Sequence, residues 1–505
     1  MESSLAATED QLVDSLSFKL PSTANYITSR DEVTFFPANG NEFSPTGVKI
    51  LRFMLTGTQW LDPRSVRIQF KLNNRNQQHN MHPINGLPSN FFRRLRILAG
   101  GQLIEDIDYY NRVCNMIHTL YPLEKRINDS IEGFGINTMF GDEQGNAGSV
   151  EKVPVLWAGQ SKVVLFPLMC GIFSQEKYLP LRFLQGLQIE LEVVNQTYDS
   201  VLLFSPPLAD VQDQAGNPVF AVPQGIPQLA SEWTISEAQI KCSVVELDTQ
   251  LDNEYTDHLM SGKNMPIPLS TFVHQVQTVG QTDRPTLSMS RAFTRLNKVF
   301  ITFYKVPYVW IHNGAAAQPN IAPGVPTNNI AWHKPLRECN YFWHPNHLYD
   351  YGTEFGTNNL QPEIPPFNTQ HGRVYQGIQS EVEMQLQIGS KQIPTIPIRS
   401  LQESYYHLRK SILGERNAQS EFNILPSQYM TYKFINVFDL QKVAGPFASG
   451  MSTRTRDLIT IKVLNLQHTD AAGATWANSY GDFLHATFAH GIAMSITDAG
   501  VTVLE

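Results

Sequence analysis

Residues 92–120 read FRRLRILAGGQLIEDIDYYNRVCNMIHTL, and residues 381–413 read EVEMQLQIGSKQIPTIPIRSLQESYYHLRKSIL. Both stretches hold the same succession: an alternating strand, a glycine turn, a second strand, and then apolar residues at helical spacing around a Tyr-Tyr pair. The turn begins at Gly100 in the first stretch and at Gly389 in the second. A unit that occurs twice indicates an internal duplication of one β domain.

The duplication extends beyond these two stretches. The apolar spacing predicts a helix over about residues 107–120 and another over about residues 400–413. We expect the pairs Tyr109-Tyr110 and Tyr405-Tyr406 to occupy equivalent places on these two helices. Three strands then follow each helix in comparable order, with unequal spacing that loop insertions would explain. The matching strands are 163–166 with 434–438, 187–194 with 458–464, and 236–247 with 483–496.

Strict alternation of apolar and polar residues dominates the rest of the chain, for example over residues 66–72 and 492–496. A period of two predicts strands that bury one face and leave the other wet or at an interface, as in antiparallel sheets. Besides the two helices above, only residues 13–20 have helical spacing, which predicts a short helix before Pro21.

The composition favours two domains that associate with other copies. The chain has 505 residues, and a single hydrophobic core stops growing at roughly 250–300 residues. Only 17% of the residues are charged, against about 25% in a typical soluble protein. A surface with few charges favours burial against other chains.

The charge distribution does not favour direct coating of nucleic acid. The formal net charge is −8, whereas a protein that coats DNA or RNA usually carries a basic face or arm. The densest basic run, Arg93-Arg94-Leu95-Arg96, lies inside a strand pattern. We therefore expect no specific nucleic acid binding, and a role around a genome only as a shell.

The domain boundary is expected within residues 248–265, where the polar segment 248–263 is predicted to be either a short helix or a linker before a new strand pattern. This boundary predicts an N-terminal arm over residues 1–40, a first β domain over 41–250 and a second over 251–505. The second domain should carry a long insertion near residues 306–376.

The sequence predicts three long loops, at residues 122–160, 196–230 and 306–376. Loops of this length are uncommon in compact domains unless they have a function or pack against another part of the protein. The last one is rich in aromatic residues, namely Trp310, Trp332, Tyr341, Phe342 and Trp343. These side chains favour packing in a core or an interface, with binding of sugars or bases as the alternative.

No feature of the sequence points to secretion or a membrane. The first 20 residues are acidic and do not resemble a signal peptide, so we expect synthesis without one in a reducing compartment. No apolar run approaches the ~20 residues of a membrane helix. The four cysteines, which are far apart and expected to be buried thiols, are Cys114, Cys170, Cys242 and Cys339.

The sequence predicts no catalytic, cofactor-binding or metal site. His333, His344 and His347 do not have a zinc-binding spacing, and Asp350 and Glu354 do not belong to a calcium loop. The glycines at 145–148 and Gly171 are predicted to lie in turns, since no phosphate-binding motif contains them. Asn195 begins an Asn-Gln-Thr acceptor that we expect to stay unmodified without a signal peptide.

Two regions of the chain resemble the double jelly-roll major capsid proteins of double-stranded DNA viruses, especially those of polinton-like viruses and virophages. One is YLPLRFLQGLQIEL at residues 178–191. The other is the opening segment, with NYIT at 25–28, FFP at 35–37, FSP at 43–45 and WLDP at 60–63. The architectural resemblance covers residues from about 40 to 505.

The resemblance implies an all-β fold of two tandem antiparallel eight-stranded jelly rolls with short flanking helices. It implies a non-enzymatic homotrimer that is nearly hexagonal, tiles an icosahedral virion shell, and meets penton and minor capsid proteins. Two alternatives remain: a secreted-type β-sandwich protein that binds or hydrolyses glycans, which would need paired carboxylates or a calcium site, and a vertex or spike protein of the same virus.

Overall fold

The computed structural model describes most, but not all, residues of the chain. They are 26–77, 80–83, 86–129, 131, 133–134, 156–195, 201–204, 228–229, 232–279, 284–304, 342, 382–413, 424, 429, 433–442, 449–454, 457–466, 468–469, 475–476 and 483–504. The expected helix at 13–20 and most of the three expected long loops lie outside these residues.

The first half of the chain forms two facing sheets of four principal strands each. The first sheet has the order β1 (Ile27–Phe35), β14 (Trp233–Leu247), β5 (Arg67–Asn74) and β9 (Ser161–Pro167). The second sheet has the order β3 (Ile50–Leu55), β11 (Leu187–Val193), β7 (Phe92–Ala99) and β8 (Gln102–Asp108). All these pairings are antiparallel.

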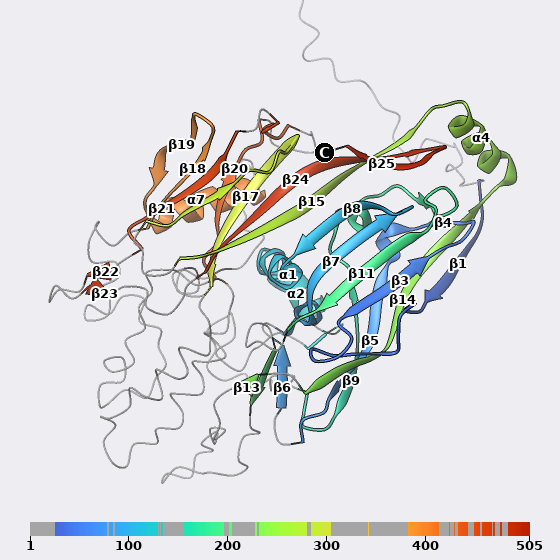
Figure 1. Cartoon of the computed structure of the whole chain (residues 1–505), viewed down its shortest axis with the longest axis horizontal. Helices are drawn as coiled ribbons and strands as arrows, with labels where there is room; N and C mark the ends of the chain where they lie inside the picture. The colour runs from blue at the N-terminus through green and yellow to red at the C-terminus, as the bar shows by residue number, and fades with distance from the viewer. Residues whose placement is uncertain are drawn as a thin grey trace, which may run out of the picture.

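The second half repeats this arrangement strand for strand (Figure 1). One sheet has the order β15 (Met265–Thr278), β24 (Phe483–Thr497), β17 (Arg295–Tyr304) and β20 (Asn436–Asp439). The other has the order β16 (Thr286–Met289), β21 (Ile459–Leu464), β18 (Glu383–Ile388) and β19 (Lys391–Ile398). Since the strand order is the same in both halves, the predicted duplication is confirmed.

The two principal helices also take matching places. α1 (Tyr110–Thr119) connects β8 to β9, and α7 (Leu401–Leu413) connects the equivalent strands β19 and β20. The first helix begins later than the expected residue 107, because Ile107 still pairs with Leu95 across β7 and β8.

The Tyr-Tyr pairs, however, are not at equivalent helical positions. Tyr110 is the first residue of α1 and is fully buried, whereas Tyr405 is the fifth residue of α7 and is half-buried against the second core. Tyr109 precedes its helix with a left-handed backbone, and Tyr406 is exposed. The expectation of equivalent places was therefore wrong, because the two helices start at different distances from the pair.

Shorter elements complete the described fold. In the first half they are β2 (Glu42–Phe43), β4 (Trp60–Leu61), β6 (Asn80–Pro83), β10 (Leu179–Pro180), β12 (Val201–Phe204), β13 (Gln228–Leu229), α2 (Leu123–Asp129), α3 (Gly171–Ser174) and two 3-10 turns at Pro63–Ser65 and Pro88–Phe91. The later ones are α4 (Thr249–Met260), β22 (His468–Thr469), β23 (Thr475–Trp476) and β25 (Gly500–Leu504). α4 occupies most of the segment where the domain boundary is expected.

Part of the expected N-terminal arm belongs to a sheet. Residues 27–35 form β1, which pairs with β14 from Ile27↔Leu247 to Phe35↔Ile240. Val33 and Phe35 pack against the first core. These contacts place this segment in the first β domain, contrary to the expected arm boundary at residue 40.

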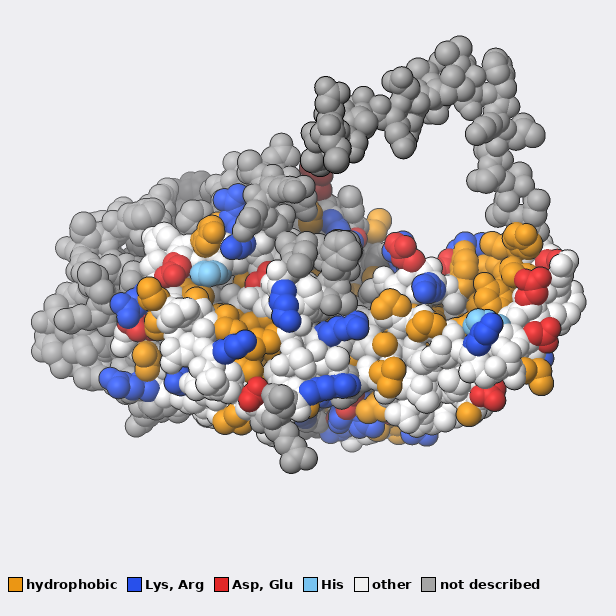
Figure 2. Space-filling view, turned by 90° about the horizontal axis from the view of Figure 1, so that it is seen from above, with side chains coloured by type: hydrophobic (Ala, Val, Ile, Leu, Met, Phe, Trp, Pro, Cys, Tyr) orange, Lys and Arg blue, Asp and Glu red, His pale blue; other side chains and the backbone are white. Residues whose placement is uncertain are grey.

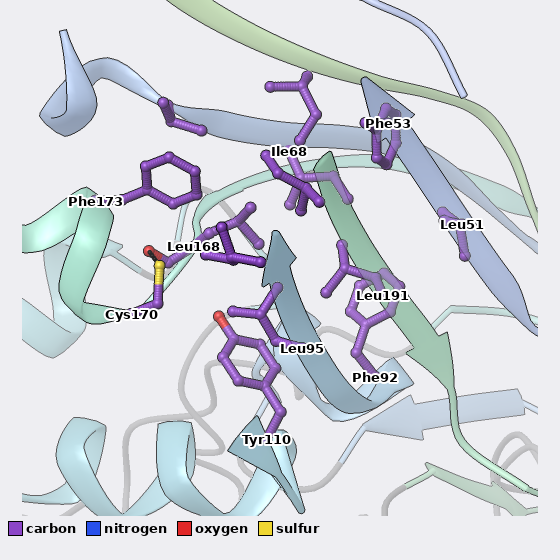
Figure 3. Close-up of a cluster of buried hydrophobic side chains, with 14 of the residues drawn as sticks. Leu51, Phe53, Ile68, Phe92, Leu95, Tyr110, Leu168, Cys170, Phe173 and Leu191 are labelled. Carbon is purple, nitrogen blue, oxygen red and sulfur yellow. Dashed lines mark hydrogen bonds between the residues drawn. The ribbon is translucent and has the colours of Figure 1, made fainter. Parts of the chain in front are cut away.

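The first core lies between its two sheets, where alternate side chains of each strand meet. Figure 3 shows Leu51, Phe53, Phe92, Leu95 and Leu191, from the β3-β11-β7 sheet, within this buried cluster. The ring of Phe70 on β5 stands edge-on to that of Phe92, with centroids 5.6 Å apart. This interdigitation follows from the period-two pattern, because each strand buries one face.

Candidate assembly surface and interdomain seam

The two halves share strands instead of meeting at a simple interface. β15 and β24 pair over their whole length, from Met265↔Ile496 to Thr278↔Phe483. One end of this ribbon contributes to the second core, and the other end contributes to the first. The residues that it adds to the first core are Ile267, Leu269, Ile492, Met494 and Ile496.

Helix α1 crosses the boundary in the opposite direction. Its Val113 and Cys114 belong to the first core, while Met116 and the following Leu120 belong to the second core. Burial of such side chains stabilises by about 1.5–3 kcal/mol each. We use the name interdomain seam for the contact between the two halves. It is formed by β8, α1 and α3 of the first half and by β15, β17 and β24 of the second half. Figure 1 shows β15 and β24 running past the first half next to β8.

A buried carboxylate lies in the middle of this seam. Glu105 of β8 accepts hydrogen bonds from the backbone N–H of Gly171 at 2.9 Å and of Ile172 at 2.6 Å, and from the Thr271 hydroxyl at 2.7 Å. Burial raises the pKa of Glu105, and the three hydrogen bonds oppose that shift. Because Thr271 lies on β15, one side chain ties both halves together.

A β-bulge in β8 buries two consecutive residues here. Ile97 pairs with Glu105 and Leu98 pairs with Leu103, so Ile104 is an extra residue in β8. Both Ile104 and Glu105 are buried, although they are neighbours in the sequence. Glu105 keeps the alternation of the buried Ile107, and the bulge turns its neighbour Ile104 to the inner face as well.

Gly171 allows the closest approach across the seam. A Cβ atom at this residue would lie 2.4 Å from the Ser270 carbonyl oxygen and 3.3 Å from Glu105 Oε1. It is the first residue of α3 and not a turn residue, so the expectation of a turn glycine was wrong. The absence of a side chain is required because backbone atoms of β15 occupy that space.

Two histidines face each other on the second half of the seam. His274 Nε2 lies 2.8 Å from His485 Nδ1, and His274 Nδ1 lies 2.9 Å from the Thr487 hydroxyl. Burial, and then the charge of Arg112, lowers the pKa of His274 to about 3. The pKa of His485 is also lowered well below its usual value by burial, Arg112 and His274. Both rings are therefore neutral near pH 7.

Two residues of the first half, near the N-terminus of α1, cover these histidines. The Tyr109 ring lies 5.2 Å from the His274 ring and 5.7 Å from the His485 ring. The Arg112 guanidinium lies over the Tyr304 ring of β17, 3.9 Å from its centroid. We call these five side chains the histidine cluster.

An exposed apolar stripe follows the edge strand β3 of the first half. Val48, Ile50 and Met54 are all more than a third exposed, and Phe36 is 68% exposed. A bridge between their neighbouring residues places Phe36 beside Met54. These four residues form what we call the β3 edge stripe. Exposed apolar side chains on an edge strand make this stripe a candidate association surface, although the exposed Arg52 lies between Ile50 and Met54.

A ladder of charges crosses the outer face of the same sheet. Glu190 of β11 binds Arg52 of β3 at 2.9 Å and Arg96 of β7 at 3.4 Å. Asp106 of β8 binds Arg94 through two hydrogen bonds of 2.6 and 2.7 Å. Counted back from the turns at Gly100 and Gly389, the second half has Lys462 in the place of Glu190, Gln385 in the place of Arg96 and Glu383 in the place of Arg94. The two duplicated sheets therefore present different surfaces.

The ladder also accounts for the basic run that the sequence contains. Arg94 and Arg96 pair with carboxylates as above, and Arg93 lies 3.5 Å from Asp108. The run lies in β7, as predicted, and its charge is largely balanced within the sheet. Figure 2 shows Lys and Arg side chains scattered among hydrophobic and acidic ones on the visible face, with hydrophobic side chains gathered toward the end where α4 lies.

Most of the residues considered as ligands lie outside the described part of the chain. These residues are His333, His344, His347, Asp350, Glu354 and Cys339. Among the described residues, no cluster of three or more His, Cys, Asp or Glu side chains could hold a metal ion. Asn195 accepts a hydrogen bond from Lys49 Nζ at 2.8 Å, and Phe342 is buried in the second core.

The three described cysteines are buried free thiols, as expected. Cys114, Cys170 and Cys242 form no disulfide, and burial raises the pKa of Cys114 and Cys242 to about 12. A thiol held in its protonated form is a poor nucleophile. No helix of the described residues is long and apolar enough to cross a bilayer.

No family model matches the sequence, and none of the curated proteins matches it. Solved structures do match over nearly the whole chain. A quasi-atomic model of the PBCV-1 virus capsid is 12% identical with a TM-score of 0.56, and the match covers 96% of this chain and 98% of that one. The fold is a double jelly roll.

Two further double jelly rolls have similar scores. The cryo-EM structure of the Sputnik virophage is 10% identical with a TM-score of 0.52, covering 99% of this chain and 92% of that one. The Faustovirus major capsid protein is 9% identical with a TM-score of 0.51, covering 95% and 93%. The predicted fold class of two tandem antiparallel eight-stranded jelly rolls is thus confirmed.

The seam of this double jelly roll is not apparent from the sequence. His274 and His485 lie within alternating strands, where a histidine on the outer face normally contacts solvent. β15 and β24, with 14 and 15 residues, exceed an ordinary strand of about 5–6 residues, but β14 also has 15 residues and contributes only to the first core, so length alone does not reveal the seam. Strands of that length can serve two cores.

Proposed function

We propose that this protein is the major capsid protein of an icosahedral DNA virus and forms trimeric capsomers. The supporting observation is the pair of jelly rolls with identical strand order, held at a fixed mutual position by shared strands. Three such chains carry six jelly rolls, which gives a nearly hexagonal outline that can tile a closed shell.

Mass measurement and microscopy test the proposal directly. Light scattering of the purified full-length chain should give about three times the chain mass. Negative-stain electron microscopy should then show hexagonal particles or sheets. A stable monomer at micromolar concentration would contradict the proposal.

We further propose that the β3 edge stripe is part of the contact between chains in the trimer. Phe36 and Met54 lie side by side on the stripe, so a Met54→Glu substitution would place a charge in a buried apolar interface. It should convert trimers into monomers that remain folded by circular dichroism. Met260→Glu on α4 is the matched control, because Met260 is also an exposed methionine on another element. Trimers that tolerate Met54→Glu would remove the stripe from the interface.

The proposal assigns the protein no catalytic activity. Among the described residues, Glu190 and Asp106 are paired with arginines, and Glu105 is sealed from solvent in the seam. A glycan hydrolase would need two carboxylates facing one another in an open cleft. Incubation with a panel of glycans should therefore release no product.

The finer assignments follow from the same proposal. The chain would divide near α4 into one jelly roll from β1 to residue 250 and another over 251–505, with an insertion near 306–376. The mature location would be the virion shell, where capsomers meet each other and separate penton and minor capsid proteins. A polinton-like or virophage-type virus is the proposed source. Mass spectrometry of purified virions would detect this chain as the most abundant protein.

A further inference from the structure

The histidine cluster joins the two jelly rolls through groups that carry only one kind of charge. His274 and His485 come from the second half, Tyr109 and Arg112 come from the first, and Tyr304 lies beneath Arg112. His485 and Arg112 are at most 5% exposed, and His274 is half-buried beside them. The contact therefore holds one fixed positive charge and two groups that acid can make positive.

The surroundings of the histidines offer no described carboxylate to balance a new charge. β24 contributes Thr487 and Phe483 beside the two rings, and β17 contributes Tyr304 at 6.1 Å from the His485 ring centre. From the first half, Arg93 of β7 lies on the Tyr109 ring, and its own partner is Asp108. Neither histidine forms an ion pair with any residue that the structure describes.

We propose that the histidine cluster makes the interdomain seam an acid-sensitive joint between the two jelly rolls. Protonation of His274 or His485 would place a second positive charge against Arg112 in a buried site. The response is a loosening of α1 from the sheet of β15, β24 and β17, while the cores inside each jelly roll stay closed. This inference concerns the single chain and does not depend on the capsid role.

The sign of the effect follows from the two states of the joint. In the closed joint the pKa of His274 is lowered to about 3, whereas in an opened joint the ring meets water and returns toward 6.5. The open joint therefore binds protons more readily, and acid favours opening. Between pH 6.5 and 3, the opening constant should rise up to about tenfold per pH unit for each histidine.

Glu105 responds to acid in the opposite direction, and the experiment must separate the two contributions. Burial raises its pKa, so protonation of Glu105 favours the closed state. A variant that lacks only the histidines keeps this contribution unchanged. The difference between the wild-type protein and that variant isolates the histidine cluster.

Hydrogen–deuterium exchange of the full-length protein tests the joint between pH 7.5 and 5.5, after correction for the intrinsic exchange rate. Peptides over α1 and over residues 270–276 should lose about tenfold or more in protection at pH 5.5. Peptides over β5 and β21, inside the two jelly rolls, should not change. The His274→Gln/His485→Gln double variant should lose this pH dependence, and His258→Gln on α4 should retain it.

Two outcomes would overturn the proposal. One is protection of α1 that does not change with pH in the wild-type protein, and the other is an unchanged pH dependence in the double variant. If the double variant does not fold, titration of the histidine ring protons of the wild-type protein by NMR decides the question. Midpoints for His274 and His485 far below 6.5 support the joint, and midpoints near 6.5 refute it.

Discussion

Replacing Glu105 should weaken the contact between the two jelly rolls. In Glu105→Ala, the N–H groups of Gly171 and Ile172 and the hydroxyl of Thr271 lose their acceptor while they remain buried. An unsatisfied buried donor costs about 1–3 kcal/mol. Some of the three donors can rearrange or reach water in the vacated space, so we expect a total loss of about 3–5 kcal/mol and not the full sum of three unsatisfied donors.

The conservative variant Glu105→Gln separates the effect of losing the charge from the effect of losing the hydrogen-bond acceptor. Its amide oxygen can still accept hydrogen bonds, but its NH₂ group would face one of the donors that now point at Glu105. We expect a loss of about 1–3 kcal/mol for Glu105→Gln. Glu176→Gln is the control, because the Glu176 side chain is 78% exposed and its pair with Arg64 lies at the surface. It should change stability by less than about 1 kcal/mol.

Urea unfolding of the purified proteins, followed by circular dichroism and tryptophan fluorescence, measures these differences. The two signals also report whether the jelly rolls still unfold together, since a weakened seam should separate their transitions. A Glu105→Ala protein within about 0.5 kcal/mol of the wild type, with one unchanged transition, would refute the role assigned to this carboxylate.

Three further changes test other parts of the structure. Gly171→Ala should destabilise by about 1–3 kcal/mol, because its Cβ would collide with the Ser270 carbonyl oxygen, and thermal unfolding should show a lower midpoint. Leu408→Ala in α7 should cost about 2–5 kcal/mol in urea unfolding, since this side chain is fully buried, whereas Tyr406→Ala on the exposed face should cost less than about 1 kcal/mol. Deletion of residues 1–24 should leave trimers intact by light scattering but impair shell closure in assembly assays; loss of folding would instead place this segment in the core.

The sequence alone determined the elements of the double jelly roll and their repetition. Alternating residues such as those of β5 and β18 must form strands with one buried face, because side chains of a strand point alternately to opposite sides. The strand–turn–strand–helix unit recurs in full, so the order of residues is enough to reveal the duplication. Burial of the three described cysteines followed from the same local rules.

Only the tertiary structure decided which residues join the two halves. Glu105 has the same inward orientation as Ile107, and no local pattern reveals that its hydrogen-bond partners lie on α3 and β15. Likewise, His274, His485 and Arg112 lie far apart in the sequence and meet only because β15 and β24 extend from one core to the other. Such contacts depend on how complete sheets pack, and a period of two residues carries no information about which sheet lies opposite.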